Sequence, residues 1–246
     1  MSFGLVAVLA PVWLWLAQAS LDMYGDMSGA SAWMMRATWD APYTALIFAM
    51  WTAMMAGMML PSAAPAVLIY ARVARSGAEP YRPVLRSYLF AAAYLVYWTA
   101  FSAAATALQA GLARAALVTT MMETATPWLA AAVLFLAGLY QWSSIKRACL
   151  ARCRTPAAWI VENWQPGALG ALRMGAAHGL YCVGCCWALM LLLFAGGVMS
   201  LWCIAALSLF VLVEKLGPFG ARGDRLVGGV LVAAAVAVAL SALAGA

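Results

Sequence analysis

Long apolar stretches alternate with short polar and charged stretches along most of this chain. Each apolar stretch is close to the length of a membrane-crossing helix. The pair of stretches around Gly196-Gly197 is short, and it fits either a tight hairpin or one broken unit. The expected spans are residues 3–19, 43–70, 88–110, 127–143, 174–195, 198–213 and 226–245. The pattern predicts an all-α, polytopic transmembrane helical bundle of about seven spans, which forms a single integral membrane domain over residues 1–246.

Composition agrees with a bilayer environment, because 67% of the residues are hydrophobic and only 9% are charged. A soluble domain carries about 25% charged residues. The segments 71–87, 144–173 and 214–225 hold 12 of the 14 basic residues. The positive-inside rule therefore places the N-terminus in the cytoplasm and, with seven spans, the C-terminus outside. The net charge of +6 is then explained by inner-leaflet anchoring, so no nucleic-acid partner is expected.

The segment MGAAHGLYCVGCCWALM, residues 174–190, holds the only histidine and three of the six cysteines. On a helix, His178, Cys182 and Cys185 fall with Met174 in a stripe of roughly 80°, and Cys186 lies just beside it. Cysteine also packs well between membrane helices, which is the structural alternative. Three cysteines one turn after the only histidine favour a metal-binding role instead.

Two further cysteines lie in the basic segment YQWSSIKRACLARCR, residues 140–154. Cys149 and Cys153 share one face if this segment is helical, and the surrounding basic side chains would favour thiolate. Topology alone explains those charges, so a structural role fits equally well. Cys203 stands alone in the sixth expected span and is given no role.

A methionine-rich run, WTAMMAGMMLPS, fills residues 51–62 of the second expected span. Met54 and Met58 share a helical face, and Met55 and Met59 lie beside them. A methionine stripe is usually soft core packing. Pro61 and Pro65, however, free the carbonyl groups of residues 57 and 61, so the helix is expected to kink or open beside Met58 and Met59.

Depth links the two sulfur-rich segments. At about 1.5 Å per residue, Met54 lies roughly 17 Å from the outer end of its span, and Cys182 lies roughly 12 Å from the inner end of its own. In a core of about 30 Å these depths coincide. Thioether, thiolate and imidazole form a soft ligand set that favours Cu(I), with Zn(II) as the second candidate. A weak uptake site at the outer face is a further idea, formed by Asp22, Met23, Asp26, Met27, Met34 and Met35.

Several motifs together resemble one uncharacterised bacterial family of integral membrane proteins that are described as predicted metal-binding. They are MWTAMMAGMMLPSAAP, YQWSSIKRACLARCR, GLYCVGCCWALMLLLFAGGVMSLW and VEKLGP. The resemblance runs from about residue 45 to 218 and implies a multi-pass protein of the bacterial inner membrane. Its motif positions include the four methionines, Pro61, Lys146, the cysteines other than Cys203, Glu214 and Lys215. His178 rests on helical spacing alone.

Glu214 and Lys215 end the sixth expected span. One interpretation is an interfacial pair that snorkels to the membrane surface. The other turns Glu214 inward, as a proton or metal group. Together with Cys149, Cys153 and Met190, Glu214 completes the set of secondary candidate site residues.

The leading hypothesis is a membrane bundle that binds Cu(I) between its second and fifth spans. It would handle or deliver the metal, or keep it as the cofactor of a membrane complex with a membrane or periplasmic protein partner. A membrane thiol–disulfide oxidoreductase using Cys182 and Cys185 is the enzymatic rival, with Cys149 and Cys153 as a relay. A structural subunit is the second rival, because the small-residue stretches suit tight helix association. The sequence is also compatible with a homo-oligomer. An ion channel is disfavoured, since no ring of intramembrane charge is visible.

Overall fold

The computed structural model describes residues 2–24, 38–76, 82–217 and 220–244 of the chain. Most of the expected outer loop lies outside these residues, and so do Pro218 and the last residue of the expected final span. Of the expected uptake site, Asp26, Met27, Met34 and Met35 lie outside the described residues, whereas Met23 is buried and Asp22 is exposed.

Every regular element of the described residues is a helix, apart from an isolated bridge between Val118 and Thr124. The helices are α1 (Ser2–Tyr24), α3 (Ala41–Ser76), α4 (Pro83–Arg114), α5 (Pro127–Gln141), α6 (Ser144–Arg154), α7 (Pro156–Glu162), α8 (Gly167–Met190), α9 (Leu192–Gly196), α10 (Leu201–Leu216) and α11 (Gly220–Ala244). The all-α fold expected from the sequence is confirmed, and each expected span overlaps at least one helix, with residues 174–195 divided between α8 and α9.

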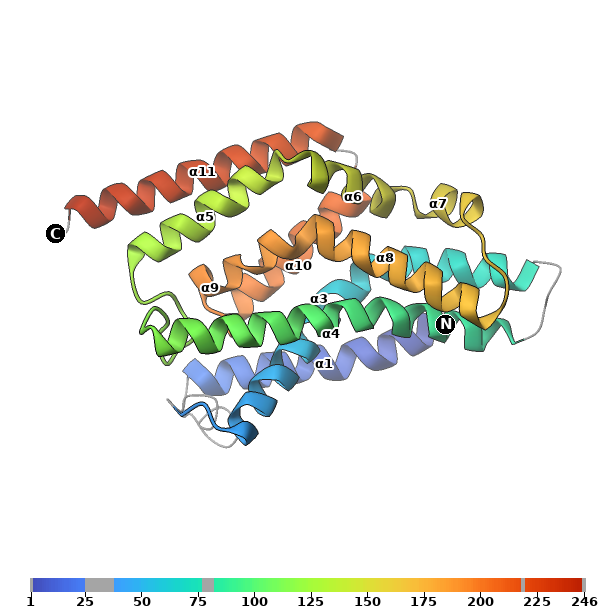
Figure 1. Cartoon of the computed structure of the whole chain (residues 1–246), viewed down its shortest axis with the longest axis horizontal. Helices are drawn as coiled ribbons and strands as arrows, with labels where there is room; N and C mark the ends of the chain where they lie inside the picture. The colour runs from blue at the N-terminus through green and yellow to red at the C-terminus, as the bar shows by residue number, and fades with distance from the viewer. Residues whose placement is uncertain (1, 25–37, 77–81, 218–219, 245–246) are drawn as a thin grey trace.

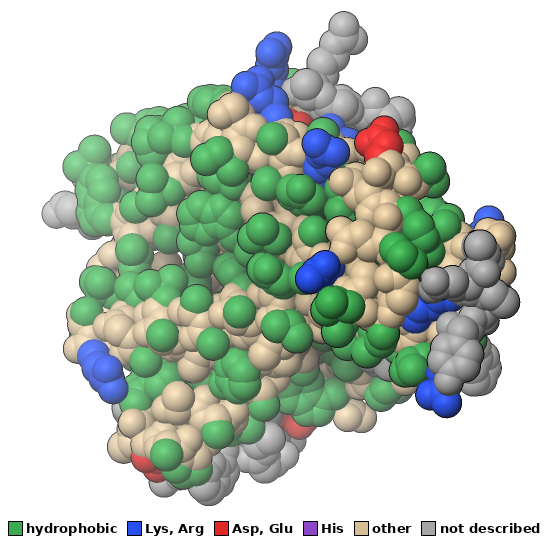
Figure 2. Space-filling model, turned by 45° about the vertical axis from the view of Figure 1, so that its right-hand side comes forward, with side chains coloured by type: hydrophobic (Ala, Val, Ile, Leu, Met, Phe, Trp, Pro, Cys, Tyr) green, Lys and Arg blue, Asp and Glu red, His purple; other side chains and the backbone are tan. Residues whose placement is uncertain are grey.

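Four helical stretches are long and apolar enough to cross a membrane: Ala41–Ser76, Pro83–Arg114, Gly167–Gly196 and Gly223–Ala244. A fifth is obtained if α5 and α6, which meet at a bend of 65°, form one broken span. This agrees with a multi-pass membrane protein, whereas the number of seven spans and the orientation stay predictions. Figure 2 shows apolar side chains spread over the visible face, with charged side chains mainly towards its margins.

The helices form one bundle in which α4 packs against both α3 and α8. Helices α5 and α11 lie side by side along one flank of the bundle (Figure 1). Helix α10 contacts α3 and α6, so it reaches the interior of the bundle close to the cysteine-bearing part of α8. The core is correspondingly rich in sulfur, with methionines from α3 and cysteines from α8 in one continuous apolar cluster.

The expected opening of α3 at its prolines does not occur, because the helix runs unbroken from Ala41 to Ser76 through Pro61 and Pro65. The carbonyl oxygen of Gly57, which Pro61 deprives of its helical donor, accepts a hydrogen bond of 3.2 Å from Trp13 Nε1 of α1. A neighbouring helix thus satisfies the freed carbonyl, as a membrane environment requires. Gly57 permits this close approach, since a Cβ there would lie 2.8 Å from a methyl carbon of Val12.

Candidate metal centre

Four thiols gather where α6 crosses α8, and we call them the thiol cluster: Cys153, Cys182, Cys185 and Cys186. The three on α8 are fully buried, and Cys153 of α6 is 7% exposed. Cys185 Sγ lies 3.2 Å from Cys186 Sγ and 4.0 Å from Cys153 Sγ. All the cysteines of the chain are free thiols. The helical spacing on α8 brings three of these thiols together, and the packing of α6 adds the fourth.

Cys149, the other cysteine of α6, lies apart from this arrangement. Its sulfur packs against Gly184 of α8, where an added Cβ would lie only 2.7 Å from Cys149 Sγ. Among the described residues no hydrogen bond joins Cys149 to the thiol cluster. Cys149 therefore lies at a close contact between α6 and α8. Of the two cysteines on α6, only Cys153 belongs to the thiol cluster.

Lys215 of α10 points into the interior of the bundle and contacts the thiol cluster. Its Nζ donates to Cys182 Sγ at 2.9 Å and to Ser62 Oγ of α3 at 2.9 Å. Lys215 is 4% exposed, so this side chain does not snorkel to the membrane surface. A cation beside a buried thiol stabilises its thiolate form, which is the form that binds metals.

Tyr94 of α4 also contacts Cys182. Its hydroxyl group lies 3.1 Å from Cys182 Sγ and donates to the carbonyl oxygen of Met59 at 3.2 Å. Helices α3 and α8 are thereby joined through a side chain of α4 and through Lys215 of α10. The sequence predicted one depth for the two sulfur-rich segments, and the Tyr94 hydroxyl group links the Met59 carbonyl group to Cys182.

A buried ion pair lies next to the cluster. Lys146 Nζ lies 2.7 Å from Glu214 Oε1, and the two side chains are 0% and 2% exposed. Lys146 also donates to the carbonyl oxygen of Cys185 at 3.2 Å. Glu214 is therefore turned inward, against the interpretation of a snorkelling pair, and its charge is balanced by Lys146. Arg154 extends the network, since it donates to the Glu214 carbonyl oxygen at 2.8 Å and to Asp224 at 3.1 Å.

His178 lies one turn before Cys182 on α8, but its surroundings are aromatic. The ring centroids of Phe90, Tyr94 and Trp159 lie 6.0, 5.7 and 6.0 Å from that of His178. The imidazole is 3% exposed, and its Nδ1 has no hydrogen-bond partner among the described residues. The predicted stripe of Met174, His178, Cys182 and Cys185 is thus present on α8. Within it, His178 lies among aromatic side chains.

The predicted methionines Met54, Met55, Met58 and Met59 are all buried to within 1% exposure, and Met190 is fully buried. They belong to the same apolar cluster as the four thiols. Their role as a second wall of thioether ligands stays a prediction. Within the described parts of the chain, no three or more His, Cys, Asp or Glu side chains form a group that could hold a metal ion.

Sequence reasoning missed Tyr94, Ser62 and the close contact that brings α4 to the site. Gly175 and Gly179 are four residues apart on α8, a small-xxx-small pattern that lets membrane helices approach closely. A Cβ added to Gly175 would meet the backbone of Phe90. A Cβ added to Gly179 would lie 3.0 Å from the carbonyl oxygen of Tyr94. This spacing within GAAHG was the available signal, and it fixes Tyr94 against Cys182.

Replacement of Gly175 by alanine is expected to destabilise the protein by about 1–3 kcal/mol or more, because the new methyl group overlaps the α4 backbone. Gly111→Ala on α4 is the matched control, since a Cβ there meets nothing within 4 Å. That control should gain about 0.5–1 kcal/mol from helix propensity. Thermal unfolding in detergent measures both changes, and equal stability of the two variants would refute the close contact.

The family model of the copper chaperone PpoB2 matches residues 48–238 of the chain. The match includes the methionine run of α3, the whole thiol cluster and the buried pair at the end of α10. No curated protein and no solved structure matches the chain.

Proposed function

We propose that this chain, which belongs to the PpoB2 copper chaperone family, carries Cu(I) as cargo at its thiol cluster and delivers it to a membrane or periplasmic acceptor protein. The observation that carries the proposal is a set of four buried thiols with the Lys215 ammonium group against one of them, and Lys215 has no carboxylate partner among the described residues. Thiolate sulfur is the ligand type that selects Cu(I), and Zn(II) is the second candidate cargo.

The distances within the cluster suit an ion held by two sulfur atoms. A metal–sulfur bond of about 2.3 Å places two sulfurs on one ion at most about 4.6 Å apart. The separations of 3.2 Å for Cys185 and Cys186 and of 4.0 Å for Cys153 and Cys185 lie within that limit. Cys182, whose sulfur Lys215 already contacts, is proposed as one of the two thiolates, and a neighbouring thiol of the cluster as the other.

The charges of the site balance for a monovalent ion bound by two thiolates. Glu214 is balanced by Lys146, whereas Lys215 has no carboxylate partner among the described residues. Without copper, the charges of Lys215 and of one thiolate sum to zero. With Cu(I), two thiolates and Lys215 again sum to zero, because the ion replaces the proton of the second thiol. Burial of the loaded site therefore leaves no net charge in the low-dielectric interior.

We propose that the methionines of α3 act as ligands of Cu(I) while the ion moves to or from the thiol cluster. Thioethers are neutral, soft ligands that bind Cu(I) without a change in charge. Met54, Met55, Met58 and Met59 follow one side of α3, and Met190 lies near the end of α8. His178, whose Nδ1 has no hydrogen-bond partner in the described part of the chain, is a further candidate ligand one turn from Cys182.

The proposed setting is the bacterial inner membrane, which the chain crosses several times. Seven spans with the N-terminus in the cytoplasm remain our proposed topology, supported by the distribution of basic residues. The lipid bilayer is then the main partner, nucleic acid is not one, and a homo-oligomer is compatible with the small-residue surfaces.

A chaperone must release its cargo, which separates this proposal from a subunit with a resident copper ion. We expect the Cu(I)-loaded, folded protein to transfer its copper to an excess of a coloured Cu(I) chelator within minutes. Absorbance of the chelator complex follows the transfer, and the circular dichroism of the helices shows that the protein stays folded. Copper that leaves only when the helices unfold would contradict delivery and favour a resident cofactor.

One observation favours a second candidate, the membrane thiol–disulfide oxidoreductase. Cys153 and Cys185 lie on different helices with their sulfur atoms 4.0 Å apart, close enough for a disulfide after a small movement. Differential thiol alkylation after oxidation and reduction distinguishes the two functions. A Cys153–Cys185 disulfide that cycles with added quinone or thiol would support the oxidoreductase, and persistently free thiols support the chaperone.

A further inference from the structure

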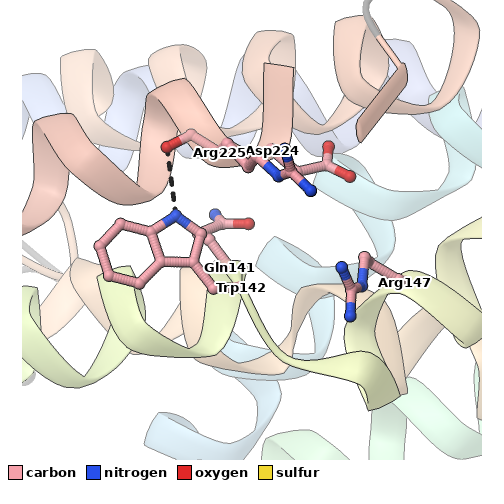
Figure 3. A pocket seen from close by; sticks show the side chains of 5 residues that line it. All are labelled: Gln141, Trp142, Arg147, Asp224 and Arg225. Atoms are coloured by element: carbon pink, nitrogen blue, oxygen red, sulfur yellow. Dashed lines mark hydrogen bonds between the residues drawn. The ribbon is translucent and has the colours of Figure 1, made fainter. Parts of the chain in front are cut away.

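A cavity lies away from the thiol cluster, where α5 bends into α6 beside the first turns of α11. Its volume is about 430 Å³, and its lining residues are Gln141, Trp142, Arg147, Asp224 and Arg225. Figure 3 shows the side chains of α5, α6 and α11 around this space, with the Trp142 indole nitrogen bonded to the Arg225 carbonyl oxygen at 3.2 Å. The function proposed above uses none of these five residues.

Gln141 is the unusual member of the lining. Its side chain is 1% exposed, yet neither Oε1 nor Nε2 has a hydrogen-bond partner among the described residues. Folded proteins rarely leave buried amide groups unpaired, because such groups lose their hydrogen bonds to water without replacement. The carboxamide offers one acceptor and two donors, so a polar ligand in the cavity would satisfy it.

The cavity also carries a net positive charge. Arg147 and Arg225 are exposed, and within the described ranges no carboxylate forms an ion pair with either. Asp224 is the one acid of the lining, and Arg154 neutralises it at 3.1 Å. Two guanidinium groups beside an amide donor match a phosphate group, which arginine binds through paired hydrogen bonds.

Exposed apolar side chains flank this cavity. Leu226 and Val230 of α11 are 71% and 67% exposed, and Leu136 of α5 is 64% exposed. Only 11% of the apolar window of α11 is buried, so this helix presents its side chains to the bilayer. A ligand with a phosphate group and alkyl chains fits both parts of the surface at once. Basic pockets between membrane helices on the cytoplasmic side bind anionic lipid headgroups in this way.

We propose that this cavity is a binding site for the phosphate group of an anionic membrane phospholipid. The phosphate lies between Arg147 and Arg225, accepts a hydrogen bond from the Gln141 carboxamide, and the acyl chains follow the exposed apolar side chains of α5 and α11. The bound lipid would tie α11 to the bend between α5 and α6.

The test uses the full-length protein in neutral detergent, titrated with phosphatidylglycerol, phosphatidylcholine or inorganic phosphate. We expect phosphatidylglycerol alone to raise the unfolding temperature with saturation. Arg147→Gln combined with Arg225→Gln should weaken this effect at least about tenfold. Arg72→Gln combined with Arg75→Gln is the matched control, because it removes two exposed arginines of α3 outside the cavity and should leave the affinity unchanged.

Gln141→Leu provides a second, independent variant. It removes a buried group that lacks partners, so it should raise the unfolding temperature without lipid and still reduce the affinity for phosphatidylglycerol. Equal losses in both double-arginine variants, or no loss in any variant, would overturn the site. Saturable protection by inorganic phosphate as strong as that by phosphatidylglycerol would overturn the lipid assignment in favour of a soluble phosphate ligand.

Discussion

The variant with Cys182, Cys185 and Cys186 replaced by serine should lose all Cu(I) binding that survives competition with a Cu(I) chelator. Each substitution replaces a soft sulfur donor by a hydroxyl oxygen, which Cu(I) does not favour. The loss should exceed the roughly 10–100-fold weakening that removal of an outer-shell partner causes in metal sites. Copper analysis after gel filtration, together with chelator competition, measures the change.

Cys203→Ser is the matched control for this experiment. Cys203 is a half-buried thiol of α10 whose sulfur lies beside Gly196, away from the thiol cluster. Its replacement removes one thiol of similar chemistry and should leave Cu(I) binding at the wild-type level. Copper retained by the triple variant, or lost equally in the control, would contradict a site at the thiol cluster.

Lys146→Met is expected to give the largest loss of stability, about 3–5 kcal/mol, because it leaves the buried Glu214 carboxylate without its partner. Combining it with Glu214→Gln removes both charges and should restore most of the loss. Unfolding in detergent, followed by circular dichroism, measures the three variants. Arg152→Met on the exposed side of α6 is the control and should change stability by no more than about 0.5 kcal/mol. A double variant as unstable as Lys146→Met would argue against the ion pair as the source of the effect.

The pattern of apolar stretches predicted the helical fold, because spans of this length leave few other structures open to the chain. The expectation that α3 opens at its prolines was wrong for a specific reason, and a kink there stays a prediction. The donor that satisfies the Gly57 carbonyl is Trp13 of α1, a contact between residues far apart in the sequence. Such tertiary partners are invisible to a local rule about proline.

In the candidate site too, the sequence predicted what one helix determines and missed the contacts between helices. Helical periodicity grouped Cys182, Cys185 and Cys186, because that grouping depends on one helix alone. Lys215 and Tyr94 reach Cys182 from other helices, so only the packed structure assigns them. His178 has the predicted register but an aromatic surrounding, which spacing alone does not reveal.

X-ray absorption at the copper edge of the Cu(I)-loaded protein tests the central claim most directly. A buried thiol cluster that carries Cu(I) predicts a first coordination shell of sulfur in the wild-type protein and its disappearance in the variant with Cys182, Cys185 and Cys186 changed to serine. A first shell of nitrogen and oxygen alone, or an identical spectrum in the two proteins, would contradict copper binding at this cluster.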